Sequence, residues 1–461
     1  MNVEFVAKAV GARPSGAGGL TVEFPLVGTD SRSVKAGQLF VALHGERFDG
    51  NDFIEEVVAR GAAGVICDEG RALARPGVAF FEVRDTLRAL GDLAAAHRRC
   101  FDVPVVAITG SNGKTTTKNL LRSVLATAYG GPDHVLATEG NLNNLIGMPL
   151  TLLTLARNHR AAILEMGMNA FGEIARLTEI AAPTLGLITC VAPAHLEGLG
   201  SIEGVARAKG ELFAGLAPTA TAVVNCDDAH VVRVAAGLGC RRQEYGAGRP
   251  VRAEDIRPDG LRGIRFGLVI PGASAAVRLP LLGRHNVGNA VAAAAAAVAL
   301  GVGIDAIVAG LESAAPAPMR LSVERLPNGV DLINDAYNAN PGSMRAALAA
   351  LEGVADHCTV VLGEMRELGS GAAELHAEVG AAVARLGPRS FCAVGPYAAD
   401  YARGAIGAGM AGAAVTPVAT NAAAAEAVAK GWRSGDAVLV KGSRGARMEE
   451  VVTELRRRAT P

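Results

Sequence analysis

The run VVAITGSNGKTT at residues 105–116 decides the fold of this chain. Its first part, Val105–Thr109, is apolar and β-branched, which is typical of a strand buried in a parallel sheet. A glycine loop follows, and Lys118–Leu125 continues in a helical pattern. A strand, a glycine loop and a helix in this order predict a phosphate cradle, because loop N–H groups and the positive end of the helix both face an anion.

Individual residues of this loop suit individual tasks in phosphate binding. Lys114 can reach a β- or γ-phosphate, and the hydroxyl of Thr115 can hold a magnesium ion. The general pattern has another glycine five residues before Gly113, where this chain has Ile108. A chance glycine turn before a helix is the alternative, which the strand–loop–helix context disfavours. The predicted nucleotide-binding set is Gly110, Ser111, Asn112, Gly113, Lys114, Thr115 and Thr116.

Length and composition indicate a large folded protein. The 461 residues allow roughly three domains of ~150 residues each. Half of the residues are hydrophobic and 20% are charged, which favours a packed core over disorder. The 45 basic residues balance the 45 acidic ones, whereas a nucleic-acid binder usually has a basic excess. We therefore expect no nucleic-acid partner, although a small anionic ligand in a local pocket stays compatible with this balance.

Cysteine usage and the N-terminal segment both indicate a cytoplasmic protein. The seven cysteines are scattered without a C-x-x-C pair, which is typical of reduced thiols rather than of a disulfide framework or a zinc ribbon. The chain begins without a basic segment followed by an apolar one, so we expect no signal peptide. The apolar stretch 287–302 is short for a membrane span of ~20 residues, and we predict a buried helix there.

Apolar runs alternate with helical patterns along the chain, which predicts an α/β protein with mostly parallel sheets. We expect a small α/β domain at 1–102, a central domain with the phosphate loop at 103–315 and a smaller doubly wound domain at 316–461. Pro104 marks the first boundary, and the proline-containing segment 313–318 marks the second. The predicted strands are Gln38–Leu43, Val65–Cys67, Ala79–Val83, Ala161–Leu164, Leu185–Val191, Thr221–Val224, Val330–Ile333, Thr359–Leu362, Phe391–Val394 and Ala437–Val440, and the predicted helices of the first domain are Asp52–Arg60 and Thr86–Arg99.

Two side chains follow predicted strands of the central sheet where a metal ion would lie. Glu165 ends the apolar run 161–164, and a carboxylate there can bind magnesium, which prefers oxygen ligands. An exposed glutamate at a strand end is an equal alternative. His195 follows the strand predicted at 185–191. A lone histidine is more often structural, but a position beyond the carboxyl end of a strand in the same sheet favours a role as a metal ligand. Thr115, Glu165 and His195 can then converge on one site.

The residues alone do not assign a function to three candidate positions later in the chain, Lys209, Arg320 and Asp335. Helical periodicity makes Lys209 a solvated helix lysine. Arg320 directly follows the proline-containing linker, and Asp335 precedes the turn-like run YNANP. An ordinary strand-to-helix loop, with Asn340 capping a helix, is slightly favoured there. Glycines also follow several strands of the last segment, at the edge where doubly wound sheets bind ligands.

Together these motifs resemble the Mur ligases, whose phosphate loop likewise lacks the first glycine of the general pattern. The segments 29–34, 39–43 and 48–50 resemble the N-terminal domain with which these ligases bind a uridine nucleotide. The runs GNLNNLIGMPLTLL at 140–153, APAHLEGLGSIEGVARAKGELF at 192–213 and NDAYNANPGSM at 334–344 resemble the members that use D-alanyl-D-alanine. The similarity covers nearly the whole chain.

This resemblance implies a cytoplasmic enzyme of peptidoglycan synthesis. ATP would phosphorylate the terminal carboxylate of UDP-N-acetylmuramoyl-tripeptide, and the amine of D-alanyl-D-alanine would attack the acyl phosphate. ADP, phosphate and the pentapeptide precursor would result. The implied domains are one that binds the UDP substrate, one that binds ATP and a Rossmann-like ligase domain, and a monomer is our default expectation.

The resemblance also implies roles for particular residues. Lys209 aligns with a lysine that is carbamylated in the family and then binds a second magnesium ion, which reverses the assignment made from periodicity. The implied catalytic residues are Lys114, Glu165, His195 and Lys209, and the implied ligands of two Mg²⁺ sites are Thr115, Glu165, His195 and carbamylated Lys209. Further ATP contacts are implied for Asn286, Asn289, Arg320 and Asp335, and substrate contacts for Ser31, Arg32, Asn141, Asn143, Asn144, Lys441, Ser443 and Arg444.

Related activities differ at identifiable places. The ligases that add diaminopimelate or lysine carry an Asp-Asn-Pro-Arg run that this chain lacks. Folylpolyglutamate synthetase shares the middle domain without the uridine-binding segment. A nucleotide-hydrolysing switch would rest on the phosphate loop alone, and an inactive relative used as a binding module disagrees with the intact loop. The residue at the third position of the tripeptide stays open.

Overall fold

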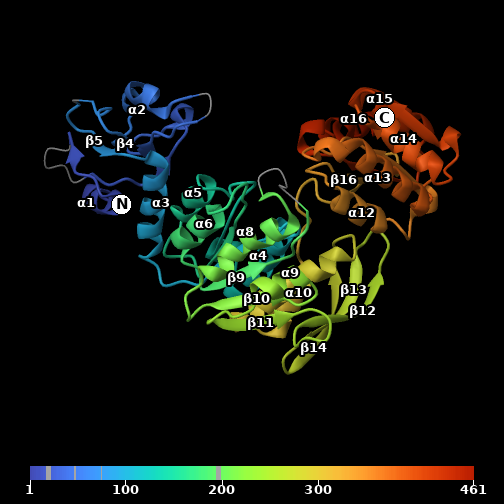
Figure 1. The fold of residues 1–461 in the computed structure, drawn as a ribbon, viewed down its shortest axis with the longest axis horizontal. Helices are drawn as coiled ribbons and strands as arrows, with labels where there is room; N and C mark the ends of the chain where they lie inside the picture. Colours follow the sequence, from blue (N-terminus) through green and yellow to red (C-terminus); the bar gives the residue numbers. More distant parts are fainter. Residues whose placement is uncertain (17–21, 46–47, 74, 194–198, 461) are drawn as a thin grey trace.

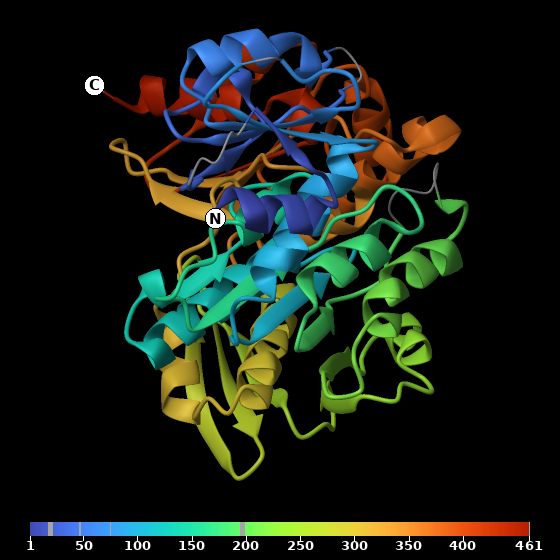
Figure 2. The same cartoon turned by 90° about the vertical axis from the view of Figure 1, so that its left-hand side faces the viewer.

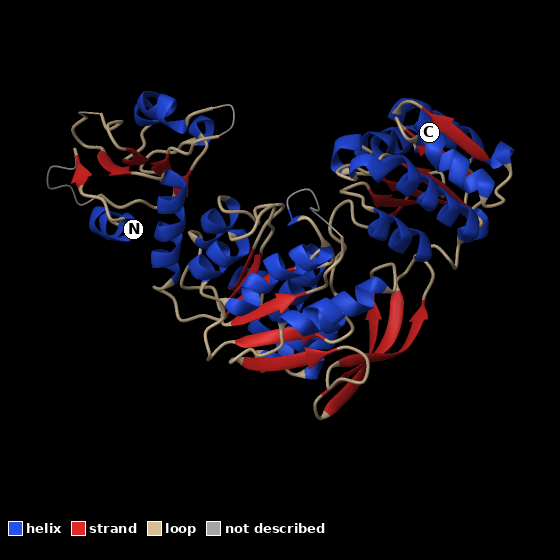
Figure 3. Cartoon of the chain, in the orientation of Figure 1, coloured by secondary structure: helices blue, strands red, loops and turns tan. Residues whose placement is uncertain are grey.

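The computed structural model describes residues 1–16, 22–45, 48–73, 75–193 and 199–460, which form three α/β domains in chain order (Figure 1). The N-terminal and C-terminal domains stand apart from one another in Figure 1, and both lie on the same side of the central domain, as the view turned by 90° also shows (Figure 2). Each domain has a sheet with helices packed against it (Figure 3). Among the residues of defined placement, no helix combines the length and apolar character that a membrane crossing requires.

The N-terminal domain has a five-stranded sheet in the order β1-β5-β4-β3-β2. All neighbours are parallel except the β1–β5 pair. Helices α1 and α3 cover one face of the sheet and α2 covers the other. The bounds are α1 Val3–Val10, β1 Pro14–Ser15, β2 Val27–Gly28, β3 Leu39–Val41, α2 Ile54–Ala59, β4 Gly64–Asp68, β5 Ala79–Val83 and α3 Thr86–Arg98.

The central domain has a six-stranded parallel sheet in the order β11-β10-β9-β6-β8-β7. Helices α4, α10 and α11 pack on one face, and α5, α6, α8 and α9 pack on the other together with the end of α3. The bounds are β6 Val105–Thr109, α4 Lys114–Tyr129, β7 Val135–Ala137, α5 Gly147–Leu152, β8 Ala161–Glu165, α6 Glu173–Ala181, β9 Leu185–Ile188, α8 Ile202–Ala214, β10 Thr221–Asn225, α9 Ala229–Val234, β11 Arg241–Tyr245, α10 His285–Ala299 and α11 Ile304–Glu312.

A second, antiparallel sheet extends the central domain between β11 and α10. It consists of β12 (Arg252–Pro258), β13 (Ile264–Ile270) and β14 (Ala273–Leu279). Apolar side chains of β13 and β14 join the core beneath α10 and α11. The sequence prediction missed this sheet, because its strands turn only one face to the core and carry mostly small or charged residues on the other.

The C-terminal domain is doubly wound, with strand order β15-β16-β20-β17-β18-β19. Only β15 is antiparallel to its neighbour. Helices α12, α13 and α14 pack on one face of the sheet, and α15 and α16 on the other. The bounds are β15 Ser322–Arg325, β16 Asp331–Asp335, α12 Pro341–Ala349, β17 Cys358–Leu362, α13 Ala372–Leu386, β18 Ser390–Val394, α14 Ala398–Gly407, β19 Val415–Val418, α15 Asn421–Gly431, β20 Ala437–Lys441 and α16 Glu449–Ala459.

The predicted fold class of three α/β domains with mostly parallel sheets is confirmed, and differences lie in individual elements. The strand predicted at 185–191 ends at Ile188, because the following residues leave the sheet to bind the phosphate loop. The helix predicted at 52–60 begins instead with a 3₁₀ turn at Gly50–Phe53. The edge strands β7, β11, β15 and β19 were missed, since short or polar edge strands carry little apolar signal. The buried helix predicted over 287–302 is confirmed as α10.

Glycines set the close packing of α13 against α14. A Cβ atom at Gly404 would overlap the carbonyl oxygen of Ala377, and one at Gly380 would overlap that of Tyr401. We predict that Gly404→Ala lowers the free energy of unfolding of the C-terminal domain by about 1–3 kcal/mol, because the backbones must move apart. Urea denaturation followed by circular dichroism measures the change.

Gly407→Ala is the matched control on the same helix. Gly407 is exposed and a Cβ atom there would meet no other atom within 4 Å. Alanine has the higher helix propensity, so this variant should be neutral or more stable by up to ~1 kcal/mol. Equal midpoints for the two variants would contradict the packing argument.

Candidate active site

The phosphate loop lies at the carboxyl edge of the central sheet, between β6 and α4. In the register of the sheet, Ile108 of β6 is opposite Glu165 of β8, and Thr109 is opposite Ile188 of β9. Because parallel strands end at one edge, this register places the loop, the end of β8 and the segment after β9 side by side. The sequence-predicted residues of the loop therefore share one site with Glu165.

Backbone contacts hold the loop from the side of β9. The N–H of Ser111 donates to the carbonyl of Cys190 at 2.9 Å, and its hydroxyl donates to the carbonyl of Ala192 at 2.8 Å. The hydroxyl of Thr189 donates to the carbonyl of Asn112. These contacts explain why the chain leaves β9 after Ile188.

Lys114 and the loop enclose the position of an anion. The Lys114 ammonium donates to the carbonyl of Gly110 at 2.6 Å, so that the side chain folds back over the loop. Burial lowers the pKa of Lys114, Arg320 lowers it further, and Glu165 acts in the opposite direction. A bound phosphate would offset this cost of burial, since it adds negative charge beside the ammonium.

The side chains of Thr115 and Glu165 are in direct contact. The Thr115 hydroxyl donates to Glu165 Oε2 at 2.9 Å, and the Asn143 amide donates to Glu165 Oε1 at 2.9 Å. Glu165 is buried, with 3% of its surface exposed, so the alternative of an exposed strand-end glutamate is wrong. A hydroxyl and a carboxylate are oxygen ligands of the kind that Mg²⁺ prefers, so the donor set fits this ion.

Lys118 and Thr138 also belong to this site, and the sequence analysis missed both. The Lys118 ammonium lies 3.8 Å from Glu165 Oε2, and the Thr138 hydroxyl accepts from the N–H of Glu165 at 2.9 Å. Lys118 follows Lys114 by one helical turn on α4, which is the signal that could have indicated it.

The structure describes only one of the two remaining predicted metal ligands, His195 and Lys209. His195 lies outside the described residues. Lys209 is on α8 and only 2% exposed, so the solvated position expected from periodicity is wrong. It shares the buried face of the helix with Val205 and Leu212. Burial and, second, the charge of Lys114 lower the pKa of Lys209 to about 7. Within the described ranges, no group of three or more His, Cys, Asp or Glu side chains is arranged to hold a metal ion.

The helix α10 contacts the loop with its first turns. Asn289 Nδ2 donates to Asn286 Oδ1 at 2.9 Å, and Asn286 Nδ2 donates to the carbonyl of Leu282 at 2.7 Å. Gly113 has φ +82°, and a Cβ atom there would overlap Asn289 Oδ1. Asn289 thus lies beside the phosphate loop, and Asn286 holds Asn289 from behind.

The C-terminal domain reaches the loop at two points. Arg320 Nη2 lies 3.4 Å from the Thr115 hydroxyl, with its guanidinium 4.3 Å from the centre of the Tyr337 ring. Asn340 Nδ2 lies 3.4 Å from Asn112 Oδ1. Asn340 also caps α12 in a capping box, which confirms the strand-to-helix interpretation of that segment.

Asp335 and Lys441 form a buried ion pair within the C-terminal domain. Asp335 Oδ2 lies 2.6 Å from Lys441 Nζ, and Asp335 Oδ1 accepts from the N–H of Leu321 at 3.1 Å. Lys441 also donates to the carbonyl of Asn338 at 2.9 Å. In this arrangement Asp335 holds the linker after Arg320, and the ammonium of Lys441 is engaged inside the domain.

The other predicted substrate residues lie away from the loop or have local partners. Ser31 and Arg32 are on the surface of the N-terminal domain, where Arg32 pairs with Asp30 at 2.9 Å. Asn144 Oδ1 accepts from the N–H groups of Ile146 and Gly147 at the start of α5. Asn141 is exposed. Arg444 pairs with Glu449 at 3.2 Å, and the Ser443 hydroxyl is buried without a hydrogen-bond partner among the described residues.

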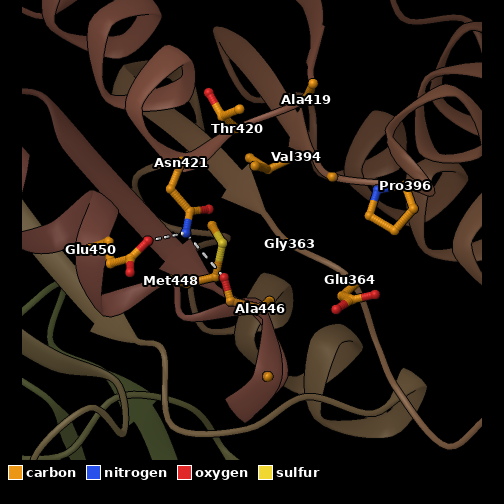
Figure 4. A pocket seen from close by; sticks show the side chains of 12 residues that line it. Gly363, Glu364, Val394, Pro396, Ala419, Thr420, Asn421, Ala446, Met448 and Glu450 are labelled. Carbon is orange, nitrogen blue, oxygen red and sulfur yellow. Dashed lines mark hydrogen bonds between the residues drawn. The ribbon is translucent and has the colours of Figure 1, made fainter.

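A cleft of about 320 Å³ lies at the carboxyl edge of the C-terminal sheet, where the sequence analysis expected ligands (Figure 4). Asn421, at the start of α15, donates to the carbonyl of Ala446 at 3.1 Å and to Glu450 at 2.9 Å. The lining residues follow four neighbouring strands and are Gly363, Glu364, Val394, Gly395, Pro396, Ala419, Thr420, Asn421, Gly445, Ala446, Met448 and Glu450.

Three family models match the chain in the order of its domains. They are the Mur ligase family catalytic domain at residues 23–98, the Mur ligase middle domain at 108–297 and the Mur ligase glutamate ligase domain at 319–444. The UDP-N-acetylmuramoyl-tripeptide–D-alanyl-D-alanine ligase of Escherichia coli is 38% identical over 96% of both chains. The ligase of the same name from Bacillus subtilis is 36% identical over 93% of this chain and 92% of its own.

Solved structures agree with these relatives. A crystal structure of MurF from Acinetobacter baumannii superposes with a TM-score of 0.90 and 34% identity, covering 99% of this chain and 98% of that one. MurF ligase from Thermotoga maritima in complex with ADP superposes with a TM-score of 0.81 and 26% identity, covering 94% and 97%.

Two glycines with the same backbone conformation test the close approach at the phosphate loop. Gly113 precedes α4 with φ +82°, and Gly172 precedes α6 with φ +86°. We predict that Gly113→Ala weakens ATP binding by roughly tenfold or more, because its Cβ displaces Asn289 from the loop. Gly172→Ala introduces the same backbone strain where a Cβ meets nothing within 4 Å, and should keep ATP binding unchanged. Calorimetric titration with ATP and Mg²⁺ separates the two, and equal losses would make backbone strain the cause.

Proposed function

The chain belongs to the Mur ligase family, and we infer that it joins D-alanyl-D-alanine to UDP-N-acetylmuramoyl-tripeptide with consumption of ATP. It is an ATP-dependent acid–amino-acid ligase of peptidoglycan synthesis. The 38% identity over 96% of both chains to the Escherichia coli ligase supports the use of D-alanyl-D-alanine. The contact of Thr115 with Glu165, beside a phosphate loop that Arg320 reaches from the next domain, supports the ATP-dependent step. The product is the UDP-N-acetylmuramoyl-pentapeptide, released with ADP and phosphate.

The first step brings anions together, which determines what the site must supply. An oxygen of the tripeptide carboxylate attacks the γ-phosphorus of ATP, and the bond to the ADP oxygen breaks. Charge develops on the transferred phosphoryl group, and fixed cations and N–H dipoles stabilise it. Lys114, Arg320 and the loop N–H groups are the donors of this chain that lie there.

In the second step, the neutral amine of D-alanyl-D-alanine attacks the acyl carbon. An amide C–N bond forms, the phosphate leaves, and the amine loses a proton. The amine and the acyl phosphate must meet beside the phosphate loop, whereas the N-terminal and C-terminal domains stand apart (Figure 1). We therefore expect the C-terminal domain to swing toward the central domain during turnover.

Magnesium fits the oxygen donors beside the loop. Thr115, Glu165 and His195 would hold one ion, and Lys209 as a carbamate would serve a second. Bound ions supply positive charge that offsets the negative charge of the phosphates.

The burial of Lys209 favours its conversion to a carbamate. With a pKa of about 7, a large share of the amine is neutral at physiological pH, and only the neutral amine reacts with carbon dioxide. The nitrogen bonds to the carbon of carbon dioxide and loses one proton, which leaves an anionic carbamate. A buried lysine thereby becomes a carboxylate-like oxygen ligand, of the kind magnesium binds.

We assign the remaining residues as follows. Residues 1–102 hold the uridine nucleotide near Ser31 and Arg32. Residues 103–315 hold ATP, with Asn286 and Asn289 on the adenine side, and the muramyl-peptide near Asn141, Asn143 and Asn144. Residues 316–461 complete the ATP site through Arg320 and Asp335 and contact the peptide near Ser443 and Arg444. Lys441, which pairs with Asp335, is assigned to the same contact with the peptide.

The C-terminal cleft is the proposed site of D-alanyl-D-alanine. This dipeptide has an ammonium group at one end and a carboxylate at the other. Glu364 and Glu450 line the cleft, where they pair with Arg366 at 2.6 Å and Arg447 at 2.8 Å, and their negative charge would also attract an ammonium group. The start of α15 at Thr420 attracts a carboxylate. We place the enzyme as a monomer in the cytoplasm, where its free cysteines stay reduced.

The function is tested by ATP-dependent phosphate release from the purified protein, with each of Mg²⁺, UDP-N-acetylmuramoyl-tripeptide and D-alanyl-D-alanine omitted in turn. We expect release only when all are present, with a product heavier by the dipeptide minus water. Turnover with free D-alanine or a diamino acid in place of the dipeptide would assign another member of the family. Release without any amine would indicate a nucleotide-hydrolysing switch, and no release at all a binding module.

Lys209→Ala should reduce kcat by roughly 100-fold or more, because an anionic oxygen ligand is lost from the site. Added acetate or formate should restore part of the activity, since a small carboxylate can occupy the space of the carbamate. Arg207→Ala removes an exposed cation from the same helix and should keep full activity. A fully active Lys209→Ala variant would overturn the carbamate assignment.

A further inference from the structure

His376 lies wholly buried on α13 and has no part in the machinery described above. It is close to the C-terminal cleft without lining it. Its imidazole contacts two neighbouring loops that do line the cleft, one between β17 and α13 and one between β18 and α14. Glu364 of the first loop and Pro396 of the second lie on the same side of the cleft (Figure 4).

Hydrogen bonds fix both the orientation and the tautomer of the His376 ring. The N–H of Met365 donates to Nε2 at 2.9 Å, so Nε2 carries a lone pair. Nδ1 lies 2.6 Å from the carbonyl of Ala372, which can only accept, so Nδ1 carries the proton. The neutral imidazole with its proton on Nδ1 is therefore the one form that satisfies both partners. It anchors the residue directly after Glu364.

Aromatic contacts tie the second loop to the same ring. The Tyr397 ring stacks on His376 with centroids 4.2 Å apart and an interplanar angle of 14°, and Tyr397 directly follows Pro396. Tyr401 meets the His376 ring edge-on at 4.9 Å, and its hydroxyl donates to the carbonyl of Gly363 at 3.0 Å. His376 and Tyr401 thus clamp the β17–α13 loop, and His376 also joins it to the β18–α14 loop.

We propose that His376 is a positioning residue for the amine substrate, because its neutral ring holds the Glu364 loop against the Pro396 loop and so shapes the cleft that binds the dipeptide. The proposal rests on the proposed function, which places D-alanyl-D-alanine in this cleft. In this proposal Glu364, which pairs with Arg366 at 2.6 Å, faces the ammonium end of the dipeptide, and its neighbour Met365 is the point at which His376 holds the loop. Loss of the His376 ring should weaken binding of D-alanyl-D-alanine and leave binding of ATP and UDP-N-acetylmuramoyl-tripeptide unchanged.

Protonation of His376 would disrupt the same contacts. A second proton on Nε2 would face the N–H of Met365, and two donors repel. Burial lowers the pKa of His376, while the bond to Ala372, Asp400 on α14 and Glu364 on the loop act in the opposite direction. Tyr397 and Tyr401 complete its surroundings. Because the folded-state pKa is below the usual 6.5, the contribution of His376 is fully present above that pH and is lost as the pH falls through the folded-state value.

The test compares three variants by steady-state kinetics with the complete enzyme. His376→Leu should raise the KM for D-alanyl-D-alanine by roughly tenfold or more, with the KM values for ATP and UDP-N-acetylmuramoyl-tripeptide changed by less than about twofold. His376→Gln keeps a donor and an acceptor but does not titrate, so it should bind the dipeptide better than His376→Leu. His97→Gln is the control, since His97 is a partly buried histidine whose ring is likewise bound to a carbonyl, on α3 of the N-terminal domain.

The pH dependence gives a readout that a purely structural role would not move. The KM of the unmodified enzyme for the dipeptide should rise more steeply below pH 6.5 than that of His376→Gln, because only the histidine gains a proton. Equal acid profiles, or a folded His376→Leu variant that raises all three KM values alike, would overturn the proposal. If His376→Leu does not fold, the comparison with His376→Gln decides. An unmodified enzyme that does not use D-alanyl-D-alanine would instead overturn the proposed function.

Discussion

The close approach of neighbouring elements to the phosphate loop is the constraint on which the rest of this structure depends. Gly110 and Gly113 leave no room for a Cβ atom, because Thr189 from the end of β9 and Asn289 from α10 occupy that space. A loop held this closely presents its N–H groups in a fixed direction, so an anion meets donors that need no rearrangement. The order of strands in the central sheet follows the same need, since β8 and β9 flank β6 and supply the partners of the loop.

Buried ionisable groups of both charge signs surround the phosphate loop. Glu165 is buried and accepts from Thr115 and Asn143, while Lys118 lies behind it at 3.8 Å. Lys114 and Lys209 are buried amines beside the loop, and burial lowers the pKa of both. Burying these groups costs free energy while the site is empty, and bound phosphates and metal ions would offset that cost. Titratable groups with pKa values shifted in this way are typical of catalytic sites.

The C-terminal domain contributes through its linker and through its sheet edge. Arg320 reaches Thr115. The next residue, Leu321, donates its backbone N–H to Asp335, which forms a buried ion pair with Lys441. At the carboxyl edge of the sheet, helices on opposite faces leave a cleft between the loops that follow β17, β18, β19 and β20. The contacts of His376 fix two of these loops relative to one another, so the cleft is shaped by a ring that does not line it.

The sequence by itself determined the fold class, the three α/β segments and the phosphate loop, because apolar periodicity and glycine spacing are local properties of the chain. It also indicated Thr115 and Glu165, since carboxyl ends of neighbouring parallel strands meet at one edge. Only the tertiary structure decided that Lys209 is buried, that Asp335 pairs with Lys441 and that His376 joins two loops. Those facts depend on which helix face meets which sheet and on contacts between residues far apart in the chain, and no local pattern carries that information.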